Sequence, residues 1–383
     1  MYIKSKKKII LVFGTRPEAI KMAPLYHSLK KSSDLFETQV CITAQHRQML
    51  DQVLSVFDIK ADIDLDLMKV GQDLFDITSS VLLGMREVLE KERPNFLLVH
   101  GDTTTTLAST IAAFYAGISV GHVEAGLRTY DFNSPYPEEF NRQVTSKIAK
   151  WHFAPTVLSR HNLLKEGVPD NQIFVTGNTV IDALFLAINR IESDSFRLKN
   201  ISNLLDERLA FSWKKDRFIL ITAHRRENFG DRFIQICHAL KELAINYPNI
   251  HFVYPVHLNP NVRMPVNLIL IGLSNLHLID PLDYEPFVYL LKHCYLVLTD
   301  SGGLQEEAPS LGKPVLVMRE VTERPEAVDA KTVRLVGADR ERIVANVSEL
   351  IENEESYKKM SHAHNPYGDG KACERIIEIL GII

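Results

Sequence analysis

The sequence predicts an α/β protein built from two Rossmann-like, doubly wound domains. Short apolar runs alternate with longer amphipathic segments along most of the chain, as in βα units that form a parallel sheet. The chain has 383 residues, more than one hydrophobic core usually serves, so we expect two domains. Its composition, 45% hydrophobic and 24% charged with a net charge of -4, is typical of globular proteins and gives no electrostatic reason to expect nucleic acid or a membrane surface.

Strands are expected where short apolar runs lie between helical segments. In the first half these runs are KIILVF (8–13), TQVCIT (38–43), FLLVH (96–100) and SVGHV (119–123). In the second half they are RFILIT (217–222), IHFVYPV (250–256), LHLID (276–280), YLVLTD (295–300), PVLVM (314–318) and VRLVG (333–337). Each half therefore supplies enough strands for a doubly wound sheet of its own.

The expected boundary between the domains lies near Asn178. We expect a first domain over 1–178, a second over 179–366, and a C-terminal helix within 367–383 that packs back across the junction. Residues 189–217 are highly charged with scattered apolar positions, which favours a solvated connecting region over either core.

Several classes of protein and site are disfavoured. No run approaches the roughly 20 apolar residues of a membrane span, and the first apolar run is too short for a secretion signal, so a cytoplasmic protein is expected. Cys41, Cys237, Cys294 and Cys373 lie far apart, in neither zinc-type pairs nor a disulfide framework. No H-E-x-x-H or comparable spacing occurs, so no metal is assigned.

The first strand end points to an anionic ligand. In VFGTRPEAIKMAPL, Gly14 is expected to allow a tight turn, and Thr15 with Glu18 forms a T-x-x-E capping box. Arg16 and Lys21 then lie near the positive end of a helix, where the helix dipole disfavours cations. A bound anion would resolve this conflict. The alternative is a pair of solvated surface cations.

Three acidic residues follow strands or the loops beyond them. Asp102 ends LLVHGD, Glu124 ends SVGHVE, and Glu138 lies beyond a loop bounded by prolines. Because ligands bind outside the carboxyl ends of parallel strands, we expect these acids to converge on one crevice, where burial and mutual repulsion can raise a carboxyl pKa for proton transfer. Asp102 alone could instead be a helix N-cap.

The second half carries a basic cluster after one strand and another histidine after the next. His224, Arg225 and Arg226 follow RFILIT, and His257 follows IHFVYPV. Histidine and arginine make charge-assisted hydrogen bonds that suit a diphosphate. The alternative is that each histidine is a structural residue.

The stretch LVLTDSGGLQEE suggests a nucleotide site. Ser301, Gly302 and Gly303 form a small-residue turn that enters a helix, where backbone N–H groups can approach phosphate oxygens. Glu307, one turn later, could bind two ribose hydroxyls. The alternative is a tight turn followed by a solvated glutamate. Neither G-x-G-x-x-G nor G-x-x-x-x-G-K-[ST] occurs, so dinucleotide and P-loop readings lose their main support.

Long blocks of the chain carry a resemblance to a known family. FGTRPEAIKMAPL, TAQHRQMLDQV, HGDTTTTLA, GHVEAGLRT, SPYPEEFNR, TAHRREN, YPVHLNP, TDSGGLQEEAPSLGKPVLVMREVTERPEAV and the NPYGDGKA tail resemble the non-hydrolysing UDP-N-acetylglucosamine 2-epimerases of bacteria. The resemblance implies a GT-B architecture with the active site between the domains, and interconversion of UDP-N-acetylglucosamine and UDP-N-acetylmannosamine without cofactor or metal. It further implies a cytoplasmic homodimer that serves polysaccharide biosynthesis.

The resemblance also implies roles for individual residues. For substrate binding and catalysis the matching positions are Arg16, Lys21, Asp102, Glu124, Glu138 and His224. For the uridine diphosphate they are Phe287, Ser301, Gly302, Gly303, Glu307 and Arg324. For a second UDP-N-acetylglucosamine that activates some members they are Gln45, Gln48, Glu138, Arg225 and His257. Two positions depart from the family: Leu282 replaces a nucleotide-contacting glutamine, and Gly71 replaces an arginine of regulated members.

The implied reaction is elimination of UDP to a bound 2-acetamidoglucal, followed by re-addition. Three rival functions fit parts of the same pattern: a GT-B glycosyltransferase, a hydrolysing epimerase, and a nucleotide-sugar sensor without catalysis. The intact GTRPEAIKMAPL block favours the non-hydrolysing group, and the full set of acids argues against a sensor, which needs no base.

Overall fold

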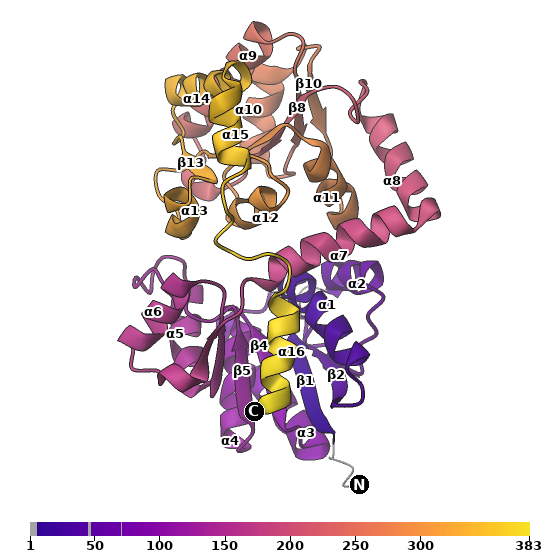
Figure 1. Cartoon of the computed structure of the whole chain (residues 1–383), viewed down its shortest axis with the longest axis vertical. Helices are drawn as coiled ribbons and strands as arrows, with labels where there is room; N and C mark the ends of the chain where they lie inside the picture. Colours follow the sequence, from indigo (N-terminus) through magenta and orange to yellow (C-terminus); the bar gives the residue numbers. More distant parts are fainter. Residues whose placement is uncertain (1–5, 45–46, 70) are drawn as a thin grey trace. The chain divides into compact units, whose positions relative to one another are not determined.

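The computed structural model describes residues 6–44, 47–69 and 71–383, which fall into two units (Figure 1). The N-terminal unit comprises Met1–Leu186 together with Tyr367–Ile383, and the C-terminal unit comprises Ala187–Pro366. The chain therefore passes to the second unit inside one helix, downstream of the boundary expected near Asn178. Its last segment returns to the first unit.

The described residues of the N-terminal unit form a seven-stranded parallel sheet in the order β3-β2-β1-β4-β5-β6-β7. Its strands are β1 (Lys7–Phe13), β2 (Phe36–Ile42), β3 (Ile63–Asp64), β4 (Phe96–His100), β5 (Ser119–Val123), β6 (Trp151–Ala154) and β7 (Ile173–Val175). Its helices are α1 (Arg16–Lys31), α2 (Arg47–Val56), α3 (Leu74–Glu92), α4 (Thr104–Tyr115), α5 (Glu138–Ile148), α6 (Val157–Lys165) and α16 (Ala372–Ile382), with α7 (Thr179–Ser193) leading into the other unit.

The described residues of the C-terminal unit form a six-stranded parallel sheet in the order β10-β9-β8-β11-β12-β13. Its strands are β8 (Phe218–Thr222), β9 (His251–Pro255), β10 (Leu276–Ile279), β11 (Leu296–Thr299), β12 (Val315–Val317) and β13 (Val333–Leu335). Its helices are α8 (Ser195–Arg208), α9 (Asp231–Asn246), α10 (Pro260–Leu270), α11 (Tyr284–His293), α12 (Leu304–Ser310), α13 (Pro325–Asp329), α14 (Arg340–Glu352) and α15 (Glu354–Ser361).

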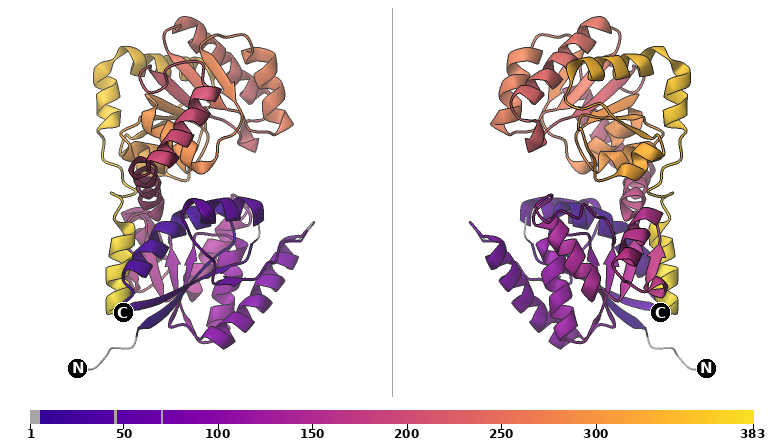
Figure 2. Two further views of the ribbon diagram at one scale, coloured as in Figure 1. Left: turned by 90° about the vertical axis from the view of Figure 1, so that its right-hand side faces the viewer. Right: turned by 90° about the vertical axis from the view of Figure 1, so that its left-hand side faces the viewer.

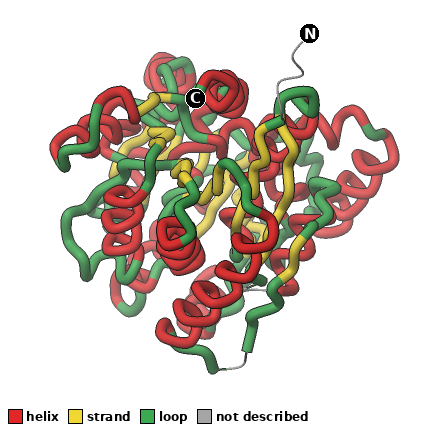
Figure 3. The backbone as a smooth tube through the Cα atoms, turned by 90° about the horizontal axis from the view of Figure 1, so that it is seen from below, coloured by secondary structure: helices red, strands yellow, loops and turns green. Residues whose placement is uncertain are grey.

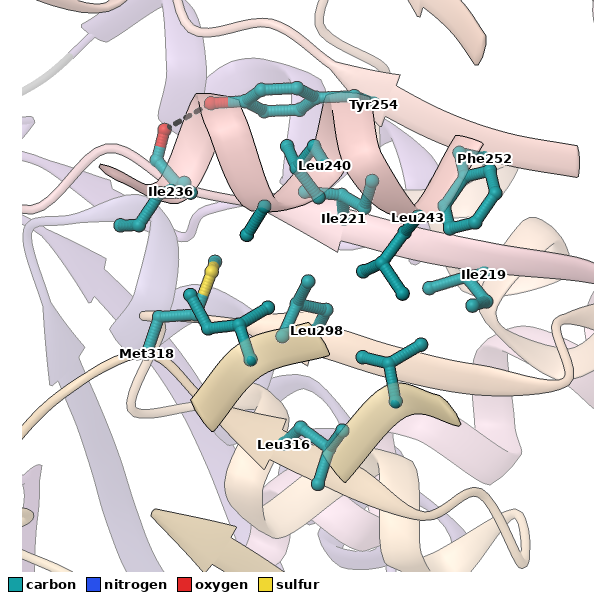
Figure 4. Close-up of a cluster of buried hydrophobic side chains, with 14 of the residues drawn as sticks. Ile219, Ile221, Ile236, Leu240, Leu243, Phe252, Tyr254, Leu298, Leu316 and Met318 are labelled. Carbon is teal, nitrogen blue, oxygen red and sulfur yellow. Dashed lines mark hydrogen bonds between the residues drawn. The ribbon is translucent and has the colours of Figure 1, made fainter. Parts of the chain in front are cut away.

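Helices cover the strands of each unit, as the side views and the tube drawing show (Figures 2 and 3). Central strands are buried on both faces and are therefore mostly apolar, as in β4, where all five residues are buried and four are apolar. In the C-terminal unit, strand residues such as Ile219 and Leu298 belong to the same cluster of buried hydrophobic side chains as Leu240 of α9 (Figure 4). No helix in the described ranges is long and apolar enough to cross a membrane.

Each sheet reverses its strand order beside the first strand of its unit, and this reversal locates the expected ligand sites. In the N-terminal unit β1 pairs with β2 on one side and β4 on the other, and in the C-terminal unit β8 pairs with β9 and β11. Open α/β sheets bind ligands outside the carboxyl ends of the strands at this switch point. Ligand-binding residues are therefore expected in the loops after β1 and β4 and in those after β8 and β11.

The strand predictions are confirmed for all six runs of the second half and for the four runs of the first half. They missed β3, β6 and β7, which have only two to four residues each. The interpretation of 189–217 as a solvated connecting region is confirmed only in part, because most of these residues are exposed but some belong to the core of the second unit. Helix α8 lies there, and Ile201, Leu205 and Trp213 are buried in the C-terminal unit.

Candidate active site

The loop between β1 and α1 depends on a close approach at Gly14. The connection from β1 to α1 is only two residues long, as the expected tight turn requires, but Gly14 does not have the positive φ that favours glycine. Instead, a Cβ atom at Gly14 would lie 2.2 Å from Thr43 Oγ1 and 2.5 Å from Thr105 Oγ1. Glycine is thus needed because two neighbouring threonines pack against the main chain here.

The capping box of α1 is present, and Glu18 does more than cap the helix. Its Oε2 accepts hydrogen bonds from the backbone of Gly14 (3.0 Å) and Thr15 (2.8 Å). Its Oε1 accepts one from Thr103 Oγ1 (2.6 Å), in the loop after β4. Burial raises the pKa of Glu18, while these hydrogen bonds oppose the rise. Glu18 therefore joins the two loops that flank the switch point.

The two cations of this loop have different surroundings. Lys21 forms an ion pair with Glu124, and its side chain is only 15% exposed, so the alternative of a solvated surface lysine is wrong. Arg16 is half-buried and makes no hydrogen bond or ion pair to any residue that the structure describes. An anion could approach Arg16 without displacing an internal carboxylate.

Glu124 follows β5 in a left-handed backbone conformation, with φ +62° and 9% exposure. Such a conformation is uncommon for glutamate and is concentrated at functional sites. Its Oε2 is paired with Lys21 and accepts a hydrogen bond from Asn178 Nδ2 (2.8 Å). His100 Nε2 lies 3.8 Å from the same oxygen.

Asp102 follows β4 and is held by residues of α5. Its Oδ2 pairs with Arg142 Nη2 at 2.6 Å, and its backbone oxygen accepts from Asn141 Nδ2 at 2.9 Å. The alternative that Asp102 is the N-cap of α4 is wrong, because Thr103 fills that position and its Oγ1 accepts from the Thr106 N–H.

Of the three acids expected to converge, Asp102 is influenced by the charges of the other two. Burial raises the pKa of Asp102, Arg142 opposes the rise, and the negative charges of Glu124 and Glu138 add to it. Glu138 is the first residue of α5 and is half-buried. The structure therefore brings Asp102, Glu124 and Glu138 to one edge of the N-terminal sheet.

Two buried histidines near this edge stay neutral at ordinary pH. Burial lowers the pKa of His100 to about 4 and that of His122 to about 3. His122 Nε2 lies 2.7 Å from the Gly101 carbonyl oxygen, beside Asp102 in the chain. Across the described ranges, no three His, Cys, Asp or Glu side chains come together as a metal site would require.

In the C-terminal unit, Asp300 fixes the loop that carries His224. Asp300 follows β11 and is fully buried, and its Oδ2 accepts from the backbone N–H of His224 and of Arg225, both at 2.8 Å. Burial lowers the pKa of His224, and Asp300 opposes this effect. The His257 ring stacks on that of His224, with centroids 5.5 Å apart.

The small-residue turn after β11 is confirmed, and it lies against Arg324. The Ser301 N–H donates to Thr299 Oγ1 at 2.9 Å, and α12 begins after Gly303. A Cβ atom at Gly302 would lie 2.7 Å from Arg324 Nη1. Buried Glu306 pairs with Arg324 Nε and holds the guanidinium in this place.

The remaining expected residues differ in their exposure. Phe287 is half-buried on α11, and Glu307 is half-buried in α12. Gln48 is exposed on α2, Gly71 is exposed, and Leu282 is half-buried before α11. Gln45 lies outside the described residues.

Sequence reasoning missed Asp300, Asn178 and the second role of Glu18. Asp300 carried the same signal as Asp102, an acid directly after a buried strand. Asn178 and Glu18 gave no local signal, because their partners are distant in the sequence.

Comparison with known proteins decides the family. The family model described as UDP-N-acetylglucosamine 2-epimerase matches residues 27–381. The chain belongs to this family. It is 57% identical over 375 residues to the UDP-N-acetylglucosamine 2-epimerase of Campylobacter jejuni, covering 98% of this chain and 97% of that protein. It is 59% identical over 373 residues to that of Yersinia pestis, covering 97% and 98%.

A solved member of the family has the same fold. The crystal structure of UDP-GlcNAc 2-epimerase from Neisseria meningitidis, bound to UDP-GlcNAc, is 52% identical in sequence with a TM-score of 0.88. The match covers 97% of this chain and 99% of that one. The family and the α/β, GT-B fold class expected from the sequence are both confirmed.

Proposed function

We propose that this chain is a UDP-N-acetylglucosamine 2-epimerase, an isomerase that interconverts UDP-N-acetylglucosamine and UDP-N-acetylmannosamine. The observation that carries the proposal is the pair of strand-end carboxylates, Asp102 and Glu124, each with its own cation, in a chain of this family. Inverting C2 requires that a proton leave one face of the sugar and another arrive on the opposite face. Two acid–base groups in different environments can divide this work.

The reaction proceeds by elimination and re-addition. The C1–O bond breaks and its electron pair leaves with UDP, so C1 gains oxocarbenium character and C2–H becomes acidic. A carboxylate takes the C2 proton, and the C–H electron pair forms the C1=C2 double bond of 2-acetamidoglucal. Protonation of C2 on the opposite face and return of the UDP oxygen to C1 complete the epimerisation.

Residues of the N-terminal unit handle the sugar in this proposal. Asp102, Glu124 and Glu138 transfer protons on the two faces of C2, and Arg16 with Lys21 stabilises the negative charge of the departing diphosphate. The raised pKa of Asp102 supports its role, because a group that takes and returns a proton works best when its pKa lies near the working pH.

Residues of the C-terminal unit bind the uridine diphosphate. His224 stabilises the leaving diphosphate, and the Ser301–Gly303 turn with Arg324 binds its oxygens, while Glu307 binds the ribose. Phe287 contributes to the nucleotide site. The position of Arg324 against Gly302, held by a buried glutamate, supports this assignment, because a fixed guanidinium suits phosphate recognition.

Further parts of the proposal come from the family resemblance. They are a homodimer, a cytoplasmic location, supply of UDP-N-acetylmannosamine for cell-surface polysaccharide, and activation by a second UDP-N-acetylglucosamine. The activator would contact Gln45, Gln48, Glu138, Arg225 and His257. The stacking of His257 on His224 supports communication between activator and substrate groups.

Incubation with UDP-N-acetylglucosamine in D2O, followed by NMR, tests the proposal. The expected product is UDP-N-acetylmannosamine that carries deuterium at C2. A glycosyltransferase or a sensor leaves C2 protonated, and a hydrolysing epimerase releases the free sugar. Either result contradicts the proposal.

A further inference from the structure

Asn178 connects the candidate active site to the place where the chain leaves the N-terminal sheet. It lies between β7 and α7 and is 2% exposed. Its Nδ2 donates to Glu124 Oε2 at 2.8 Å, the same oxygen that pairs with Lys21. Two donors from different elements, α1 and the β7–α7 loop, therefore converge on one carboxylate oxygen.

Glu124 depends on such donors. A buried carboxylate stays ionised only where hydrogen bonds and opposite charge replace water. Among the described residues, Lys21 on α1, His100 on β4 and Asp102 in the loop after β4 are titratable groups that face it. His100 is neutral at ordinary pH and Asp102 repels a second negative charge, so the Asn178 amide adds to the stabilisation that Lys21 provides.

The returning C-terminal segment fixes Asn178 in turn. The Asn178 backbone N–H donates to the Tyr367 carbonyl oxygen at 2.7 Å, and Tyr367 is fully buried. The Asn178 side chain also caps α7, because its Oδ1 accepts from the Val180 N–H at 3.1 Å. The backbone N–H of Asn178 and both its side-chain nitrogen and its side-chain oxygen thus form hydrogen bonds within the N-terminal unit.

We propose that Asn178 is a positioning residue for the epimerisation: its amide orients Glu124 and keeps it ionised for proton transfer. This inference rests on the proposed function, since it takes Glu124 to be a proton-transfer group. A purely structural role for Asn178 would require only its capping oxygen. The two ends of the side chain can therefore be tested separately.

The variant Asn178→Asp separates the role of the side-chain nitrogen from that of the side-chain oxygen. Aspartate caps a helix as well as asparagine does, so α7 keeps its cap. The donor to Glu124 is lost, and a second carboxylate makes ionisation of Glu124 less favourable. We expect kcat to fall about 10- to 100-fold, since a misplaced catalytic group costs up to about 10²-fold, with KM changed less than about twofold. The acidic limb of the rate profile should move to higher pH by about one unit.

Asn353→Asp is the matched control. Asn353 is an exposed N-cap whose Oδ1 accepts from the Ser356 N–H at 3.0 Å, on α15 of the other unit. The same chemical change there should leave kcat and the pH profile unchanged.

Asn178→Ser guards against a trivial failure to fold. Serine keeps a capping oxygen but lacks an amide that reaches Glu124, so kcat should fall. The acidic limb of the rate profile should move less than in Asn178→Asp, because no carboxylate is added. Wild-type kcat and pH profile in Asn178→Asp would overturn the inference. Unfolding of both variants would overturn it as well, because the side chain would then serve stability.

Failure of this inference can be told from failure of the proposed function. If the wild-type chain introduces no deuterium at C2 of the substrate in D2O, the proposed function itself fails. If the wild type exchanges and Asn178→Asp exchanges equally fast, the role of Asn178 alone is refuted.

Discussion

A single methyl group at Gly302 should weaken UDP binding, because the site has no room for it. A Cβ atom there would lie 2.7 Å from Nη1 and 3.0 Å from Cζ of Arg324. Such distances force a neighbour to move, and Arg324 is the neighbour. Its Nε is paired with Glu306, which is fully buried, so the guanidinium cannot shift without disturbing that pair.

The size of the effect follows from this crowding. Overpacking costs about 1–3 kcal/mol. If the guanidinium rather than the main chain gives way, most of this cost appears as lost affinity, about 5- to 150-fold in Kd. Isothermal titration of UDP into Gly302→Ala measures it, and thermal unfolding checks that the variant is folded.

Gly303→Ala provides the matched comparison. The nearest atom to a Cβ at Gly303 is Glu307 Oε2 at 3.9 Å, and the residue already has helical angles, φ -61° and ψ -41°. Its Kd for UDP should therefore change much less than that of Gly302→Ala. Equal Kd values for the two variants would refute the reasoning, since it depends on the contact with Arg324.

Three further outcomes are expected. Asp102→Asn should lower kcat about 10²- to 10⁴-fold in a steady-state assay, because an acid–base group is lost while Arg142 keeps a hydrogen-bonding partner; Asp170→Asn, which breaks an exposed Asp–Arg pair, should not. Asp300→Ala should lower the free energy of unfolding by about 1–3 kcal/mol in denaturant titrations, because two partly buried backbone N–H groups lose the carboxylate oxygen that they share, and an unchanged value would contradict this. Burial lowers the pKa of His122 from 6.5 to about 3, so on acidification the unfolded chain binds a proton at this residue before the folded chain does. The free energy of unfolding should therefore stay constant above about pH 6.5 and fall below it, by up to about 1.4 kcal/mol per pH unit for this group. In His122→Gln the dependence on pH should be flatter.

The sheet strands could largely be predicted from the sequence because central parallel strands are buried on both faces. Such strands, β4 and β11 among them, read as continuous apolar runs. Strands β3 and β7 were missed because their apolar runs are no longer than the strands themselves, whereas the equally short β12 lies within the longer apolar run 314–318. Helix α8 was missed because it buries only Ile201 and Leu205, while its other positions are charged, polar or not fully buried.

The candidate site could be predicted where chemistry follows a strand directly. Asp102, Glu124 and the Ser301–Gly303 turn were found in this way. Gly14 was found for the wrong reason, because its crowding comes from Thr43 and Thr105, which are distant in the sequence. Asn178 could not be found, because its contact with Glu124 exists only in the folded chain.

The most direct test of the central claim is the rate at which solvent deuterium enters C2 of UDP-N-acetylglucosamine in the wild type, Asp102→Asn and Glu124→Gln. We expect both variants to bind UDP normally and to exchange at least about 100-fold more slowly than the wild type. Wild-type exchange in both folded variants would show that these two strand-end carboxylates do not move the C2 proton.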